Sequence, residues 1–228
     1  MDGLGVKGAF MFNYVEDKEY LSRVRSVCGE IMQDFCHTLK EDYDIGSTFY
    51  LVGSGAKNLI VQNASQPIDL DYNLEIVRCE DFDDCRTLKE CARKAFNKAL
   101  YMNGWGNCAD STSSLTTKRR YFSQGNQTLF SIDVCIVFTD TQGRMYRLIH
   151  EKRGFIYDDR YYWNQAPHSS GIREKVDFIK RKGKWNLVRE QYLRLKNKYL
   201  TSNDYNHPSF VCYIEAVSNV YNSRMSWK

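Results

Sequence analysis

Apolar side chains recur at every third or fourth position in several stretches of the chain. Between residues 16 and 40 they form one stripe, which contains Leu21, Val24, Cys28, Ile31, Phe35 and Leu39. This period predicts an amphipathic helix. The same pattern predicts a helix over residues 84–101 and a short one from Ala56 to Gln62. Near the C-terminal end, three more helices are indicated: one marked by Ile172, Val176 and Ile179, one over the stripe Trp185–Tyr199, and one that Pro208 opens.

Other stretches favour β-strands. The segment PIDLDYNLEIV alternates between polar and apolar positions before it becomes continuously apolar, and TLFSIDVCIVF is strongly apolar. STFYLVGSG, LTTKRRYF and GRMYRLIH are further candidates, whereas the aromatic stretch from Phe155 to Ser170 has no regular pattern. We therefore predict an α+β fold. A mixed β-sheet core flanked by helices would occupy residues 1–155, and a helical accessory segment would occupy residues 156–228.

Composition and charge narrow the class of protein. Of the 228 residues, 43% are hydrophobic, which is enough for a packed core and argues against disorder. The eight cysteines form no CxxC pair, and no secretory signal opens the chain, which indicates reduced thiols in the cytoplasm. No apolar stretch approaches ~20 residues, so we expect no membrane span.

The positive charge is concentrated near the C-terminal end. The chain carries a formal net charge of +4, but residues 171–200 hold ten Lys or Arg against three acidic residues. That segment therefore has a net charge of +7, which points to an anionic partner such as a nucleotide or RNA. The alternative is an ordinary solvated helix face.

Three aspartates carry the most informative chemistry. Asp69 and Asp71 are two residues apart on one predicted strand, so their side chains point to the same face. Asp133 lies inside the apolar strand FSIDVCIV. If the two strands are neighbours, the three carboxylates converge and repel one another unless cations compensate. Such oxygen ligands suit Mg²⁺ or Mn²⁺, and two such ions can clamp a phosphoryl displacement.

Gly53 and Ser54 supply a complementary feature. They follow an apolar strand and precede a short helix, where backbone N–H groups and a hydroxyl can meet a phosphate. Lys57 and Lys175 are further candidate phosphate ligands, against the alternative that both are surface lysines. The Walker pattern GxxxxGK[ST] is absent.

The order GSGAKNL, IDLDYNL and FSIDVCIV resembles the DNA polymerase β-type nucleotidyltransferase superfamily. The resemblance covers roughly residues 48–138. It implies transfer of a nucleoside monophosphate from an NTP, such as ATP, with release of pyrophosphate. Asp69 and Asp71 would then bind both metal ions, Asp133 would bind the ion that activates the acceptor hydroxyl, and Gly53 and Ser54 would hold the triphosphate.

The acceptor stays open at this point. A nucleotide or RNA is favoured by the basic C-terminal segment, and a cyclic-nucleotide synthase falls within the same chemistry. The alternatives are nucleotidylation of a small molecule or a protein, and a catalytically inactive nucleotide-binding module. The sequence does not indicate an oligomeric state.

Overall fold

The computed structural model describes residues 11–155, 157–166, 170–202 and 209–227. The chain divides into two compact units. We call Asp17–Asn58 with Pro67–His168 the sheet unit, and Met1–Glu16, Leu59–Gln66 and Ser169–Lys228 the helical unit.

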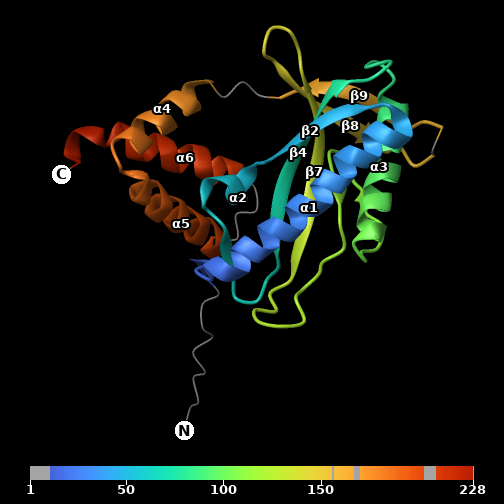
Figure 1. Ribbon diagram of the computed structural model, residues 1–228. Helices are drawn as coiled ribbons and strands as arrows, with labels where there is room; N and C mark the ends of the chain where they lie inside the picture. Colours follow the sequence, from blue (N-terminus) through green and yellow to red (C-terminus); the bar gives the residue numbers. More distant parts are fainter. Residues whose placement is uncertain (1–10, 156, 167–169, 203–208, 228) are drawn as a thin grey trace. The chain divides into compact units, whose positions relative to one another are not determined.

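The described residues of the sheet unit form a seven-stranded mixed sheet (Figure 1). Its strands are β2 (Gly46–Leu51), β4 (Ile68–Arg78), β5 (Ala109–Asp110), β6 (Leu115–Thr116), β7 (Phe130–Thr139), β8 (Met145–Glu151) and β9 (Arg160–Gln165). The order is β2-β4-β7-β6-β5, and β8 pairs with both β7 and β9. The two long central strands, β4 and β7, are parallel, whereas their other neighbours are antiparallel.

Two helices, α1 (Lys18–Tyr43) and α3 (Cys85–Met102), cover the sheet and pack against each other (Figure 1). Each begins at an aspartate whose side chain accepts a backbone N–H three residues ahead: Asp17 from Tyr20, and Asp84 from Thr87. The apolar stripes meet in the core, where the rings of Phe35 and Phe96 stack at 4.8 Å. The helix α3 also supplies the crossover that parallel strands require.

The helical unit contains α4 (Ser170–Arg181), α5 (Trp185–Thr201), α6 (Ser209–Asn222) and the short turn η1 (Arg224–Ser226). A two-stranded sheet of β1 (Phe12–Tyr14) and β3 (Val61–Asn63) joins them. Its buried core consists of Leu59, Ile179, Val188, Tyr192, Leu195, Cys212, Tyr213, Ala216, Val217 and Val220. The predicted α+β class, with a mixed sheet flanked by helices, is confirmed.

Two predicted elements are wrong in detail. The short helix, α2, spans Gly53–Lys57 and ends at Asn58, which has φ 57°, while Val61–Asn63 is a strand instead of helix. LTTKRRYF yields only the two-residue β6 and an isolated bridge at Arg120. The cause is Thr117, whose hydroxyl accepts the N–H of Ile132 and interrupts a regular ladder.

The stretch after residue 155 also differs from its prediction. Arg160–Gln165 forms β9, and this strand belongs to the sheet unit, so the units do not divide near residue 155. Half-buried Tyr161 and Trp163 alternate with exposed residues, which is the pattern of an edge strand. The predicted helix start at Pro208 lies outside the described residues, although α6 follows directly at Ser209.

Candidate active site

Parallel pairing of β4 and β7 brings the predicted aspartates together. Asp71 is the register partner of Asp133, and Asp69 is the partner of Ser131. Adjacent strands lie about 4.8 Å apart, so the side chains of partners on one face are close neighbours. Between the two aspartates of β4, Leu70 is fully buried on the opposite face. The predicted juxtaposition on adjacent strands is therefore confirmed.

The carboxylates are near enough to affect one another's charge. Burial raises the pKa of Asp71 to about 6, with further contributions from the negative charges of Asp133 and Asp69, while Lys57 opposes the shift. Burial also raises the pKa of Asp133; the hydroxyl of Thr116 lowers it and the charge of Asp69 raises it. A cluster of this kind binds a proton or a cation readily because either relieves the repulsion.

Two hydroxyl groups orient the carboxylates. Thr116 Oγ1 donates a hydrogen bond of 2.5 Å to Asp133 Oδ1, and Ser131 Oγ donates to Asp69 Oδ1. Thr116 comes from β6, which pairs with β7 at Asp133 itself. Neither hydroxyl could be predicted from the sequence, because β6 is too short to show an alternating pattern and Ser131 carries no motif of its own.

Gly53 lies directly against Asp71. Its φ is +59°, in the left-handed region that favours glycine, and a Cβ atom here would stand 2.2 Å from Asp71 Oδ2. The backbone N–H of Val52 donates to the carbonyl oxygen of Asp71 at 2.8 Å, which fixes the turn on β4. Only glycine lets the chain pass this close to the carboxylate.

The other predicted phosphate ligands lie in two different places. Ser54 follows Gly53 in α2, and Lys57, in the last turn of α2, donates from Nζ to the carbonyl oxygen of Gly53 at 3.0 Å. These two residues therefore lie on the short helix that begins beside Asp71. Lys175 lies in the helical unit, where its Nζ is 3.4 Å from Ser218 Oγ. Its role at a nucleotide stays a prediction.

The carboxylates would supply only part of the ligands that a metal ion needs. Among the described residues, no three His, Cys, Asp or Glu side chains are grouped closely enough to hold a metal ion by themselves. One oxygen each of Asp69 and Asp133 is occupied by a hydroxyl donor. The arrangement suits Mg²⁺ or Mn²⁺, which are commonly held by one or two carboxylates and completed by water and substrate phosphates.

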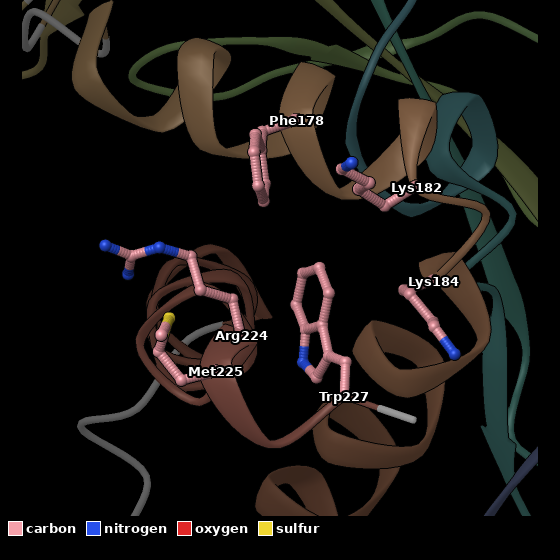
Figure 2. Close-up of a pocket in the computed structure, with 6 residues that line it drawn as sticks. All are labelled: Phe178, Lys182, Lys184, Arg224, Met225 and Trp227. Atoms are coloured by element: carbon pink, nitrogen blue, oxygen red, sulfur yellow. The ribbon is translucent and has the colours of Figure 1, made fainter.

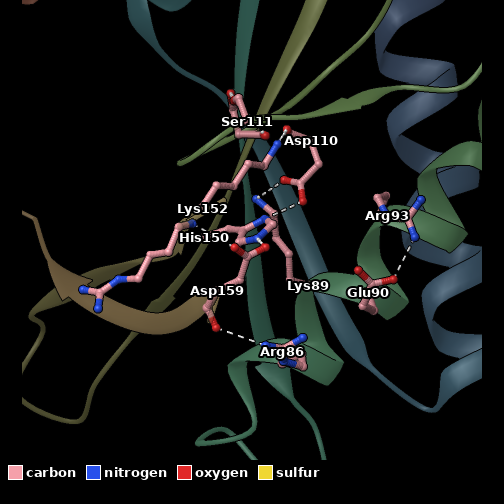
Figure 3. A network of polar contacts seen from close by, with 11 residues as sticks. Arg86, Lys89, Glu90, Arg93, Asp110, Ser111, His150, Lys152 and Asp159 are labelled. Atoms are coloured by element: carbon pink, nitrogen blue, oxygen red, sulfur yellow. Dashed lines mark hydrogen bonds and ion pairs between the residues drawn. The ribbon is translucent and has the colours of Figure 1, made fainter. Parts of the chain in front are cut away.

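A buried ionic network lies at the β5 end of the same sheet (Figure 3). His150 is 5% exposed; its Nδ1 is 2.7 Å from Asp110 Oδ2, and its Nε2 is 2.9 Å from Asp159 Oδ2. The backbone N–H of Arg153 and then His150 lower the pKa of Asp159.

Lys89 completes this network from α3. Its side chain is 1% exposed, and its Nζ lies 3.2 Å from Asp110 Oδ1, at ion-pair distance but without hydrogen-bond geometry. Burial lowers the pKa of Lys89, and Asp110 counteracts that shift. Lys89, His150 and two aspartates thus tie β5 to α3, β8 and the segment before β9. No sequence pattern revealed these partners, because they are far apart in the chain.

Comparison with known proteins gives matches in structure alone. No protein-family model and no curated protein sequence matches the chain. Vibrio cholerae DncV in its 3'-deoxy GTP bound form superposes with a TM-score of 0.62 and 13% identity, over 92% of this chain and 67% of DncV. E. coli MS115-1 CdnC, solved with ATP, gives a TM-score of 0.53 and 16% identity, over 92% of this chain.

The chain spans 62% of the length of that CdnC structure. A third structure is the Vibrio cholerae DncV cyclic AMP-GMP synthase with the linear intermediate 5' pppA(3',5')pG. It matches with a TM-score of 0.54 and 10% identity, over 96% of this chain and 81% of that one.

These similarities define the fold. It is the nucleotidyltransferase fold of the DNA polymerase β type, and the predicted resemblance is confirmed at that level. Among solved structures of this fold, the chain is similar to DncV, which is described as a cyclic AMP-GMP synthase, and to CdnC, which was solved with ATP. Within the described residues, no helix combines the length and apolar character needed to cross a bilayer.

Proposed function

We propose that this protein is a metal-dependent nucleotidyltransferase that moves a nucleoside monophosphate from an NTP to the hydroxyl group of a second nucleotide. We further propose that its products are short oligonucleotides of the cyclic dinucleotide class. The register of β4 and β7, which pairs Asp71 with Asp133, is the observation that carries the proposal.

The similar structures favour a nucleotide acceptor over RNA, a small molecule or a protein. DncV is described as a cyclic AMP-GMP synthase and was solved with a linear dinucleotide intermediate, and CdnC was solved with ATP. Because identities are 10–16% in these two cases, the comparison supports the fold, and the activity rests on the aspartates.

Asp69, Asp71 and Asp133 would hold Mg²⁺ or Mn²⁺. The residues fit such an ion: the donors are hard oxygens, burial and mutual repulsion raise the pKa of Asp71 to about 6, and a cation relieves that repulsion. When bound, the ion would neutralise charge that develops on the phosphoryl oxygens.

The chain's own groups would position the reactants. Gly53 lets the turn lie directly against Asp71, and Ser54 and Lys57 would contact the triphosphate at that turn. In the reaction, the acceptor oxygen forms a bond to the α-phosphorus, and the bond from the α-phosphorus to the bridging oxygen breaks. Pyrophosphate leaves, and the hydroxyl proton passes to water or a carboxylate.

The test is incubation of the protein with α-labelled NTPs, singly and in pairs, with Mg²⁺ or Mn²⁺. We expect a product that contains a new phosphodiester bond and resists phosphatase, because a cyclic product has no terminal phosphate. Asp71→Asn and Asp133→Asn should abolish it, whereas Glu41→Gln, an exposed carboxylate on α1, should not.

The same assay separates the alternatives. Transfer only after addition of total RNA would favour an RNA acceptor. NTP binding by the native protein without any transfer, under both metals and with every NTP pair, would contradict the proposal and favour an inactive binding module.

A further inference from the structure

A cavity of about 360 Å³ lies within the helical unit, between α4, the turn into α5 and η1. Its lining consists of Phe178, Lys182, Lys184, Arg224, Met225 and Trp227. Figure 2 shows the rings of Phe178 and Trp227 next to each other, with Arg224 at one flank and the two lysines at the other. The volume falls at the lower end of the range for small-molecule sites.

The lining is positively charged without compensation from its own members. Three of the six lining residues are cations, and no Asp or Glu is among them. Lys182 and Arg224 are exposed, so their charged groups can move to meet a ligand. A concave surface with charges of one sign concentrates counter-ions, and guanidinium and ammonium groups are the usual partners of phosphate.

The aromatic residues add a second requirement. The rings of Phe178 and Trp227 are tilted by 37° with centroids 6.1 Å apart, so they contact each other while their remaining faces and edges line the cavity. The indole Nε1 of Trp227 is buried and has no hydrogen-bond partner among the described residues. Figure 2 places this nitrogen on the side of Arg224 and Met225. A buried donor without a partner is unfavourable, and a ligand acceptor would satisfy it.

We propose that this pocket binds a nucleoside phosphate, with the base against Phe178 and Trp227 and the phosphates bound by the exposed cations Lys182 and Arg224. A flat ring next to negative charge is the one ligand chemistry that uses both the aromatic and the cationic halves of the lining. All six lining residues belong to the helical unit, whereas the three aspartates belong to the sheet unit. The proposal therefore does not depend on nucleotidyl transfer by the protein.

Binding of ADP, measured by equilibrium dialysis in EDTA, tests the proposal. Chelation removes metal-dependent binding at the aspartates, so the remaining affinity reports on the pocket. We expect Lys182→Ala/Arg224→Ala to weaken binding by about tenfold or more, because two phosphate partners are lost. Trp227→Leu should weaken it by about fivefold to a hundredfold, the range for loss of a stacked base.

A matched variant separates a specific site from general attraction. Arg194→Ala/Lys198→Ala removes two exposed cations of α5 that do not line the pocket, and it should leave ADP binding within about twofold of the native value. Adenosine alone and pyrophosphate alone should each bind more weakly than ADP, because each engages half of the lining.

Three results overturn the proposal: no ADP binding at millimolar concentration, equal losses in the pocket and matched variants, or pyrophosphate binding as tightly as ADP. Thermal melting checks that each variant is folded. If Trp227→Leu unfolds, the exposed pair Lys182 and Arg224 decides the question alone.

Discussion

Replacement of Gly53 by alanine tests the proposed site most directly. A Cβ atom at this position would lie 2.2 Å from Asp71 Oδ2, whereas real Cβ contacts are essentially never closer than 3.0 Å. The carboxylate and the turn must therefore separate by at least 0.8 Å. A misplacement of about 1 Å at a reacting centre costs on the order of 10² in rate, so we expect at least that loss of nucleotidyl transfer.

The same substitution has a separate cost in stability. Gly53 has φ +59°, and alanine in the left-handed region costs about 1–2 kcal/mol relative to glycine. Gly104 provides the matched control, because its φ is +72° but nothing lies within 4 Å of the Cβ position. Gly104→Ala should lose a similar free energy of unfolding in urea and keep its transfer rate.

Rates of pyrophosphate release, compared at equal folded fraction, decide between the two effects. If Gly53→Ala transfers nucleotides within about threefold of the native rate, the turn at Gly53 does not adjoin the reacting groups. If both glycine variants lose activity equally, backbone strain is the cause, and the contact with Asp71 is irrelevant.

Further predictions concern the charged groups of the sheet unit. Asp71→Asn should lower the transfer rate by about 10²–10³ or more. Folding raises the pKa of Asp71 to about 6, so the contribution of this carboxyl to stability is full below about pH 4 and is lost as the pH rises through 6. In EDTA, the free energy of unfolding of Asp71→Asn should therefore exceed that of the native protein by on the order of 2–3 kcal/mol at pH 7 and by nothing near pH 4. Urea denaturation at the two pH values checks the sign. Thr116→Val removes the hydroxyl that lowers the pKa of Asp133, so the acid limb of the pH dependence of the transfer rate should move to higher pH. Thr116→Ser keeps a hydroxyl and should keep the native acid limb. An unchanged limb in Thr116→Val would show that this hydrogen bond is unimportant. Lys89→Met leaves Asp110 buried without its lysine partner and should lower the free energy of unfolding in urea by about 3–5 kcal/mol. Lys98→Met breaks an exposed ion pair and should lower it by less than about 1 kcal/mol. Equal losses would contradict the role of burial.

Local patterns in the sequence predicted the long elements. The stripe from Leu21 to Leu39 appears as α1, and the alternation of IDLDYNLEIV appears as β4, because burial of one face imposes its period on consecutive residues. For the same reason, the shared face of Asp69 and Asp71 followed from their spacing alone. The fold class could be predicted because each of these elements is long enough to show its period.

The short strands and the edge strand were not predicted from the sequence, because their stability comes from partners distant in the chain. The strand β3 forms by pairing with β1, about fifty residues earlier, and β9 forms by pairing with β8. In both, few side chains are fully buried, so the sequence carries a weak alternation. The position of β9 in the sheet unit likewise depends on pairing, and no residue near 155 marks it.

Tertiary structure alone decided how the aspartates are held. The sequence determined that Asp69, Asp71 and Asp133 lie on strands, but the parallel register set Asp71 beside Asp133. It also brought the hydroxyl of Thr116 to one carboxylate and the backbone of Gly53 to another. These contacts join segments separated by 17 or more residues. A pattern along the chain indicates which face of a strand a residue occupies, but only folding in three dimensions determines which residue of another strand lies next to it on that face.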